Sequence, residues 1–178
     1  MTHSALSGSS RSFRLCALCC VLLFWAAPVR ASDQTLYECV EVIDGDSVLV
    51  LAEGLLAPVR LLGIDCPEMD QEWGEAARKF TAEHVLGREV RLEFDNPRRD
   101  NYHRNLCYLW YRQDGGWACL NLELVRAGLA VPYRPRSSIR MQPEILEAQE
   151  DALNANAGFW DQGGLQRHPR EHRRLHRD

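Results

Sequence analysis

The chain has 178 residues, of which 46% are hydrophobic and 26% are charged, and its formal net charge is −4. These values exclude a disordered acidic tail and a protein with several membrane spans, and the length favours one domain. The longest apolar run, Leu15–Ala27, has 13 residues, whereas a membrane-spanning helix needs about 20.

The N-terminal segment, residues 1–31, has the organisation of a secretory signal peptide. Arg11 and Arg14 precede the apolar run, and Val29 and Ala31 supply small residues for a signal peptidase, so we expect cleavage after Ala31. An uncleaved N-terminal anchor is the alternative. We therefore expect a secreted or periplasmic monomer with no stable membrane association after cleavage.

The mature chain is negatively charged. Cleavage moves the net charge from −4 to −7, because the removed segment carries three arginines and no acidic residue. Residues 162–178 hold five arginines and two acidic side chains, net +3, which leaves −10 for residues 32–161. Such a body repels polyanions, so any nucleic-acid binding must depend on particular arginines and a bound cation.

Four cysteines remain after cleavage, and three pairings among them are possible: they are Cys39, Cys66, Cys107 and Cys119. No CxxC spacing occurs among them, which argues against a zinc site. Cys39 and Cys107 lie in alternating apolar segments that also fit buried thiols, so the pattern predicts no particular disulfide.

The first half of the mature chain has the alternation and turn residues of β-structure. The expected strands are Tyr37–Ile43, Ser47–Leu51, Pro58–Ile64, Glu89–Phe94 and Arg104–Tyr111. Asp44-Gly45 is a hairpin dipeptide between the first two, Asp95–His103 is expected to be a polar loop, and Asp114-Gly115-Gly116 is expected to close the fifth strand.

Helical spacing is expected over Glu75–Leu86, Asn121–Ala127 and Pro143–Asn156. Five short strands with about three helices predict an α+β domain over residues 32–161, built on a small barrel. Because side chains fill the interior of such a barrel, its chemistry must lie in the surface loops.

Residues 162–178 form a basic tail that we expect to be disordered. Its charged and imidazole side chains are Arg167, Arg170, Arg173, Arg174 and Arg177 with His168, His172 and His176. They could hold polyanions or bind metals weakly, but a dispensable solubilising end is the preferred interpretation.

Three polar clusters interrupt these elements: Asp44–Ser47, Arg60–Glu68 and Asp100–Arg104. Alone, the first is an ordinary hairpin turn and the third an ordinary loop. The second is more informative, because packing gives no reason for an arginine in an alternating apolar strand. Asp65 and Glu68 flank a rigid proline and can point into one space, which favours a bound cation.

Taken in this order, the three clusters resemble the staphylococcal nuclease, or thermonuclease-like, family. They match its aspartate-glycine-aspartate turn, its arginine strand ending in aspartate, threonine, proline and glutamate, and its loop with aspartate, tyrosine and a second arginine. Leu124–Ala130 resembles the family's next helix, and the likeness runs from Leu36 to Trp160. It implies an OB-fold-like five-stranded barrel with packed helices, and a calcium-dependent endonuclease acting on DNA and RNA.

The resemblance also implies a metal site. Asp46 and Asp65 would ligate one Ca²⁺ per domain, with help from the backbone carbonyl of Cys66. Cys66 stands where the family has threonine, which is harmless if only that carbonyl is used. Calcium takes about 6–8 oxygen ligands in loose geometry, so water and a substrate phosphate can complete its shell.

The same resemblance implies the catalytic residues. Glu68 would act as the general base on water, and Arg60 and Arg104 would hold the scissile phosphate with planar guanidiniums. Tyr102 and Tyr133 are further candidates for substrate contact, since aromatic rings beside arginines suit base stacking.

A catalytically inactive nuclease-like module that binds nucleic acid or protein is the alternative. Such modules are expected to lose some of the polar groups, because carboxylates hinder phosphate binding unless they hold a metal. This sequence has all five: Asp46, Arg60, Asp65, Glu68 and Arg104. We therefore favour the enzyme.

Overall fold

The computed structural model describes residues 35–135 and 138–176, so the expected signal peptide lies outside the described residues. The strands are β1 (Leu36–Asp44), β2 (Ser47–Ala52), β3 (Leu55–Leu61), β4 (Ile64–Asp65), β5 (Glu89–Arg99), β6 (Asn105–Gln113), β7 (Gly116–Cys119) and β8 (Val131–Pro132). The helices are α1 (Gly74–Val85), α2 (Leu120–Arg126), α3 (Gln142–Asn154), the 3₁₀ helix η1 (Gly158–Gln162) and α4 (Pro169–Leu175). None of these helices is long and apolar enough to cross a membrane.

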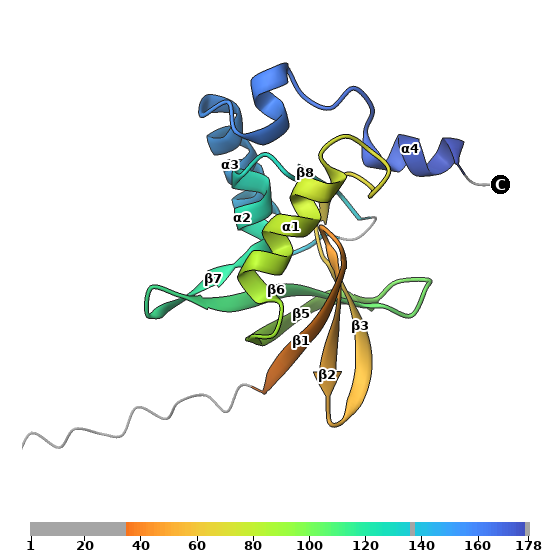
Figure 1. Cartoon of the computed structure of the whole chain (residues 1–178), viewed down its shortest axis with the longest axis vertical. Helices are drawn as coiled ribbons and strands as arrows, with labels where there is room; N and C mark the ends of the chain where they lie inside the picture. Colours follow the sequence, from red (N-terminus) through yellow and green to blue (C-terminus); the bar gives the residue numbers. More distant parts are fainter. Residues whose placement is uncertain (1–34, 136–137, 177–178) are drawn as a thin grey trace, which may run out of the picture. The chain divides into compact units, whose positions relative to one another are not determined.

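Five strands close into a barrel of mixed pairing (Figure 1). The sheet order is β3-β2-β1-β5-β6-β7, and the neighbours along it pair antiparallel. A parallel pairing of β3 with β6, in which Leu61 faces Cys107, closes the ring. The predicted α+β class with a five-stranded OB-fold-like barrel is thereby confirmed.

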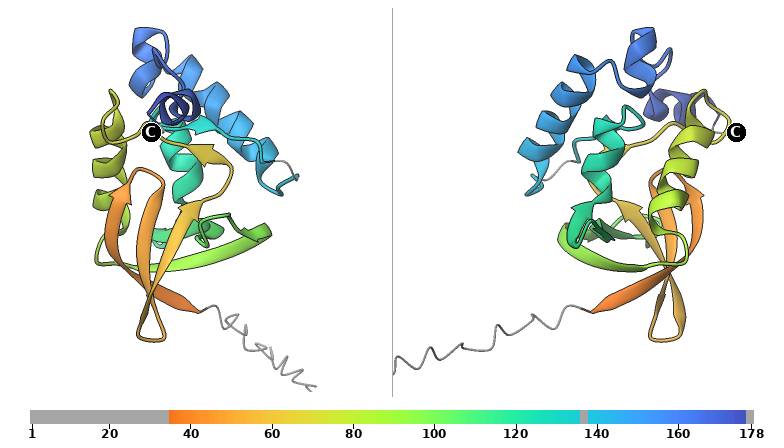
Figure 2. Two further views of the ribbon diagram at one scale, coloured as in Figure 1. Left: turned by 90° about the vertical axis from the view of Figure 1, so that its right-hand side faces the viewer. Right: turned by 60° about the vertical axis from the view of Figure 1, so that its left-hand side comes forward.

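The helices α1, α2 and α3 gather at one end of the barrel, as the views in Figures 1 and 2 agree. Helix α1 packs on β1, and α2 packs between β6 and α3. The three predicted helices begin and end within one or two residues of the observed ones. This end of the fold therefore agrees with the helical periodicity of the sequence.

The strand predictions need several corrections: β3 begins at Leu55, before the predicted Pro58, and the short strand β8 was not expected. Gly63, at φ +82°, interrupts the predicted third strand, so Ile64–Asp65 becomes the separate strand β4 and pairs with β8. A Cβ at Gly63 would lie 2.6 Å from the side chains of Ile139 and Ile145. β5 continues to Arg99, and β7 follows β6 beyond the hairpin turn. The sequence pattern did not predict the end of β5 or the strand β7, because apolar and polar residues do not alternate in these segments.

The expected disorder of residues 162–178 also differs from the structure. Helix α4 forms there, with Pro169 in its first turn, and the described part of the chain makes one compact unit. The segment packs on the loop of residues 66–73, which joins β4 to α1: the Gln71 side chain donates a hydrogen bond to the Arg167 carbonyl at 3.3 Å. The charge composition of the segment does not reveal this docking, because the docking depends on partners about a hundred residues away.

One buried polar side chain, that of Asn121, connects α2 to the strands where the barrel closes. The Asn121 carbonyl oxygen accepts a hydrogen bond from the Leu109 N–H at 3.0 Å. Its amide donates to the carbonyls of Leu62 at 2.9 Å and Cys107 at 3.4 Å. Asn121 is fully buried, so water cannot replace these bonds.

Replacing Asn121 with alanine is expected to lower the free energy of unfolding by about 2–4 kcal/mol, because buried backbone groups lose their partners. Urea denaturation measures the change. The matched control is Asn154→Ala at the exposed end of α3, expected to change stability by less than about 0.5 kcal/mol. A loss below about 1 kcal/mol for Asn121→Ala would contradict this role.

Candidate functional site

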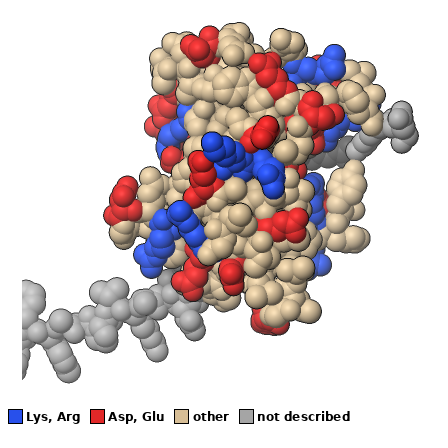
Figure 3. Space-filling view, in the orientation of Figure 1, with Lys and Arg blue, Asp and Glu red and all other residues tan. Residues whose placement is uncertain are grey.

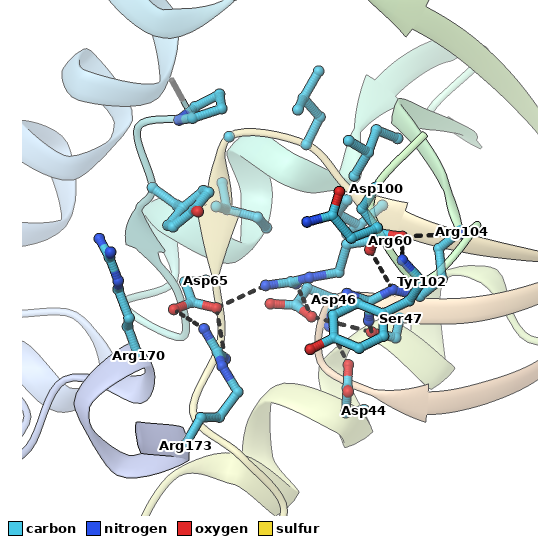
Figure 4. Close-up of a pocket in the computed structure, with 18 of the residues that line it drawn as sticks. Asp44, Asp46, Ser47, Arg60, Asp65, Asp100, Tyr102, Arg104, Arg170 and Arg173 are labelled. Carbon is cyan, nitrogen blue, oxygen red and sulfur yellow. Dashed lines mark hydrogen bonds and ion pairs between the residues drawn. The ribbon is translucent and has the colours of Figure 1, made fainter. Parts of the chain in front are cut away.

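The three polar clusters of the sequence meet in one pocket of about 1110 Å³ (Figure 4). Seven of the eight predicted site residues line it: Asp46, Arg60, Asp65, Glu68, Tyr102, Arg104 and Tyr133. The eighth, Cys66, is buried beside it, and its backbone N–H contacts Asp46. Strands and loops of the barrel therefore bring together residues that are far apart in sequence.

The turn between β1 and β2 is shaped by close packing against α1. A Cβ at Gly45 would lie 2.7 Å from the Ala77 Cβ and 2.8 Å from the Cys66 Cβ. The Thr81 hydroxyl, on α1, donates a hydrogen bond to the Gly45 carbonyl at 2.6 Å. The glycine of the hairpin dipeptide is thus required by this contact, and helix α1 fixes the position of Asp46.

Asp46 is 4% exposed, and both of its carboxylate oxygens have partners. One accepts a hydrogen bond from the Cys66 N–H at 2.6 Å, and the other accepts one from the Ser47 hydroxyl at 3.3 Å. Asp46 also forms an ion pair with Arg60. These contacts hold the carboxylate in one orientation at the floor of the pocket.

Arg60 joins the two buried carboxylates. It lies on β3 between Val59 and Leu61, whose side chains enter the core. Its guanidinium contacts Asp46 and donates to Asp65 at 2.7 Å. Burial lowers the pKa of Arg60 and the charge of Asp65 counteracts it, and arginine stays protonated at neutral pH.

Glu68 is held beside Asp65 by the 66–73 loop. The Glu68 N–H donates to the Gln71 side-chain oxygen at 3.0 Å, and the Gln71 N–H donates to the Glu68 carbonyl at 2.9 Å. Gly74 starts α1 so close to this loop that a Cβ there would overlap the Glu68 carbonyl. The loop is therefore compact, and the Glu68 carboxylate faces the pocket.

Arg104 enters the pocket from the loop between β5 and β6. Its Nε donates to Asp100 at 2.7 Å, and one Nη lies 3.4 Å from the Ser47 hydroxyl. Partial burial would raise the pKa of Asp100, but hydrogen bonds from Arg104 hold it below its ordinary value. The Tyr102 ring covers the guanidinium at 5.5 Å. Asp100 therefore orients Arg104.

The two tyrosines lie at different depths. Tyr102 is 66% exposed at the rim of the pocket. Tyr133 is half-buried, and its N–H donates to the Gly63 carbonyl at 2.8 Å. Both rings are within reach of a ligand in the pocket.

Arg173 of α4 is a site residue that the sequence analysis missed. Its guanidinium donates to the two Asp65 oxygens at 2.8 and 3.0 Å and forms an ion pair with Glu68. Burial alone would lower the pKa of Arg173, but these two carboxylates raise it. Figure 4 shows Asp65 between Arg60 on one side and Arg173 on the other.

Arg170 and Arg174 of the same helix also line the pocket. The sequence does contain a pattern that predicts an arginine-bearing face on this helix. Pro169 favours a helix start, and arginines at positions 170, 173 and 174 have the spacing of one helical face. It was overlooked because a short arginine-rich end also has the composition of a disordered tail.

The charged residues elsewhere do not form a continuous basic surface on the face drawn in Figure 3. Acidic and basic side chains are interspersed there. This agrees with the net negative charge of the body.

All four described cysteines are buried and free: Cys39, Cys66, Cys107 and Cys119. Burial raises the pKa of Cys39 and of Cys119 to about 11, and it raises those of Cys66 and Cys107 further. The thiols are therefore neutral at physiological pH. The buried-thiol interpretation of Cys39 and Cys107 is confirmed.

The fold and the site together define the class of protein: a small β-barrel with parallel and antiparallel strand pairs, and a pocket lined by carboxylates and arginines. Residues 58–162 match the family described as staphylococcal nuclease homologue, and the chain belongs to this family. The matched region ends before α4, so Arg173 lies outside it.

Curated relatives agree with this assignment. The chain is 34% identical to a thermonuclease of Staphylococcus hyicus over 137 residues, which cover 74% of this chain and 78% of that protein. It is 35% identical to a thermonuclease of Staphylococcus intermedius over 67% of this chain and 73% of that protein. A protein of Haemophilus influenzae named uncharacterized endonuclease is 30% identical over 79% and 74%, respectively.

Replacing Arg173 with alanine is expected to release α4 from the pocket. A partly exposed charge pair contributes on the order of 1 kcal/mol, so amide exchange in α4 should become about fivefold faster. Hydrogen-exchange mass spectrometry measures this, and the barrel amides should be unaffected. Arg174→Ala, at an exposed position of the same helix, is the control. Equal exchange rates in both variants would show that Arg173 does not hold the helix.

Proposed function

We propose that the chain is an exported, Ca²⁺-dependent nuclease that hydrolyses phosphodiester bonds of DNA and RNA with little sequence specificity. The observation that carries the proposal is the convergence of three carboxylates and two arginines in one pocket. Membership of the staphylococcal nuclease family and relatives named thermonuclease and endonuclease support phosphodiester cleavage. The signal-peptide pattern of residues 1–31 supports export.

The donor set at the floor of the pocket fits calcium. Asp46 and Asp65 are buried carboxylates, and hard oxygen ligands are those that Ca²⁺ prefers. Two buried anions so close together require positive charge, which Arg60 and Arg173 supply here. Asp46, Asp65 and the Cys66 carbonyl would hold the cation. When bound, it supplies positive charge that stabilises the extra negative charge on the phosphate during attack.

The remaining side chains have distinct proposed roles. Glu68 accepts a proton from the attacking water, for which a carboxylate at the pocket surface is suited. Arg60 and Arg104 bind the nonbridging phosphate oxygens through paired N–H groups. Because Arg60 contacts two carboxylates, it must exchange part of these contacts to reach the phosphate. Asp100 already orients Arg104 toward the pocket.

Binding of nucleic acid without cleavage is the alternative function. Two features count against it. Glu68 keeps its carboxylate at the pocket, although a negative charge there weakens phosphate binding. The basic residues of the body also lack an excess over the acidic ones.

Metal dependence tests the proposal directly. The purified mature protein, residues 32–178, is expected to cut circular and single-stranded DNA and RNA with Ca²⁺, and a chelator should abolish cutting. Gel analysis with Ca²⁺, with Mg²⁺ and with chelator measures this. Nucleic-acid binding without cutting under any of these conditions would favour the binding module instead.

Glu68→Gln is expected to lower the turnover rate by about 10²- to 10⁴-fold, the contribution of a general base. The fold and Ca²⁺ affinity should stay nearly unchanged, because the amide keeps the size of the side chain. Single-turnover cleavage, circular dichroism and calcium titration measure these three properties. Glu72→Gln, on the same loop but exposed, is the matched control. Turnover within tenfold of the unaltered protein would exclude Glu68 as the base.

A further inference from the structure

A second polar cluster joins α4 to the 66–73 loop, and none of its residues lines the pocket described above. The His172 Nε2 lies 2.9 and 3.0 Å from the two carboxylate oxygens of Asp70. The His172 and His176 rings stack with centroids 4.1 Å apart. One ligand atom from each of the three residues lies within 4.8 Å of the others.

The helix itself creates the histidine pair. Residues four apart lie on one face of a helix, so His172 and His176 project in the same direction. Asp70 comes from the loop that also carries Glu68. The His172 side chain is only 11% exposed, whereas that of Asp70 is 65% exposed and His176 is exposed. The cluster therefore has a fixed inner ligand and two outer ligands that solvent ions can reach.

The ligand chemistry differs from that of the catalytic pocket. Two imidazole nitrogens and one carboxylate oxygen are a donor set of zinc and related transition metals, whereas Ca²⁺ prefers oxygen ligands. Ligand atoms around a tetrahedral zinc lie about 3.4 Å apart, so the three ligand atoms, which lie within 4.8 Å of one another, move closer together to hold an ion. Water can supply the fourth ligand. The absence of a CxxC spacing does not argue against this site, because its ligands are two histidines and a distant aspartate.

We propose that Asp70, His172 and His176 form a binding site for a zinc-class divalent cation that fastens α4 to the 66–73 loop. Three residues from two elements far apart in sequence share one ion in this arrangement. The bound ion replaces a single histidine–carboxylate contact with three metal–ligand bonds. The site is separate from the calcium site in position and in ligand type.

The site has a consequence for catalysis, and this part rests on the proposed function. Arg173 directly follows His172 and pairs with Asp65 and Glu68. A cation that fixes α4 keeps the Arg173 guanidinium on the carboxylates that calcium and the attacking water need. Zinc bound at this site therefore inhibits the nuclease.

Isothermal titration of the untagged mature protein with zinc chloride tests the site without any activity measurement. We expect one zinc per chain in the presence of excess Ca²⁺. His176→Ala, at an exposed position that the fold tolerates, and His172→Ala should each weaken binding at least tenfold. His168→Ala, an exposed histidine that precedes α4, should leave it unchanged. No binding, or equal binding by His176→Ala and the unaltered protein, would overturn the proposal.

Cleavage rates test the regulatory part. At saturating Ca²⁺, one equivalent of zinc should slow DNA cleavage at least fivefold in the unaltered protein, and much less in His176→Ala and Arg173→Ala. Equal inhibition of all three proteins would place the inhibitory zinc elsewhere and refute the regulation. Absence of cleavage with Ca²⁺ alone would refute the proposed nuclease function, and the titration would still decide the zinc site.

Discussion

The site depends on one electrostatic constraint: two aspartates are buried next to each other, and a buried arginine must lie between them. Asp46 and Asp65 are almost without solvent contact, and Arg60 contacts both. Removing charges from water is costly unless they are paired, so this arrangement is stable only with all three groups in place. The arginine in an otherwise apolar strand is therefore explained by its partners, which come from the β1–β2 turn and from β4.

The barrel supplies the geometry that this constraint requires. Pairing of β3 with both β2 and β6 places Arg60 at the closure of the ring, next to the turn that carries Asp46. Gly63 ends β3 and redirects the chain so that Asp65 follows on β4. Helix α1 packs so tightly on the turn that only glycine fits at position 45. Packing of the whole domain thus positions a few carboxylate oxygens.

Helix α4 adds a layer outside the region that matches the family. Its Arg173 gives Asp65 a second guanidinium, and its His172 contacts Asp70 on the loop that carries Glu68. One short helix therefore contacts the pocket carboxylates Asp65 and Glu68 and carries two of the proposed zinc ligands. The segment contributes positive charge beside two carboxylates of the negatively charged body.

The sequence by itself determined the barrel class and the three main helices, and with its resemblance to the staphylococcal nuclease family it implied seven of the residues that line the pocket, although not Arg173. Alternation, helical spacing and residue order are local properties, so they can be read without coordinates. Only the tertiary structure decided that Arg173 lies on Asp65 and that His172 meets Asp70, 102 positions away. A tail of arginine and histidine has the same composition whether it is docked or free. The partners of this tail are carboxylates that are buried or distant in sequence, and only folding of the chain brings them next to it.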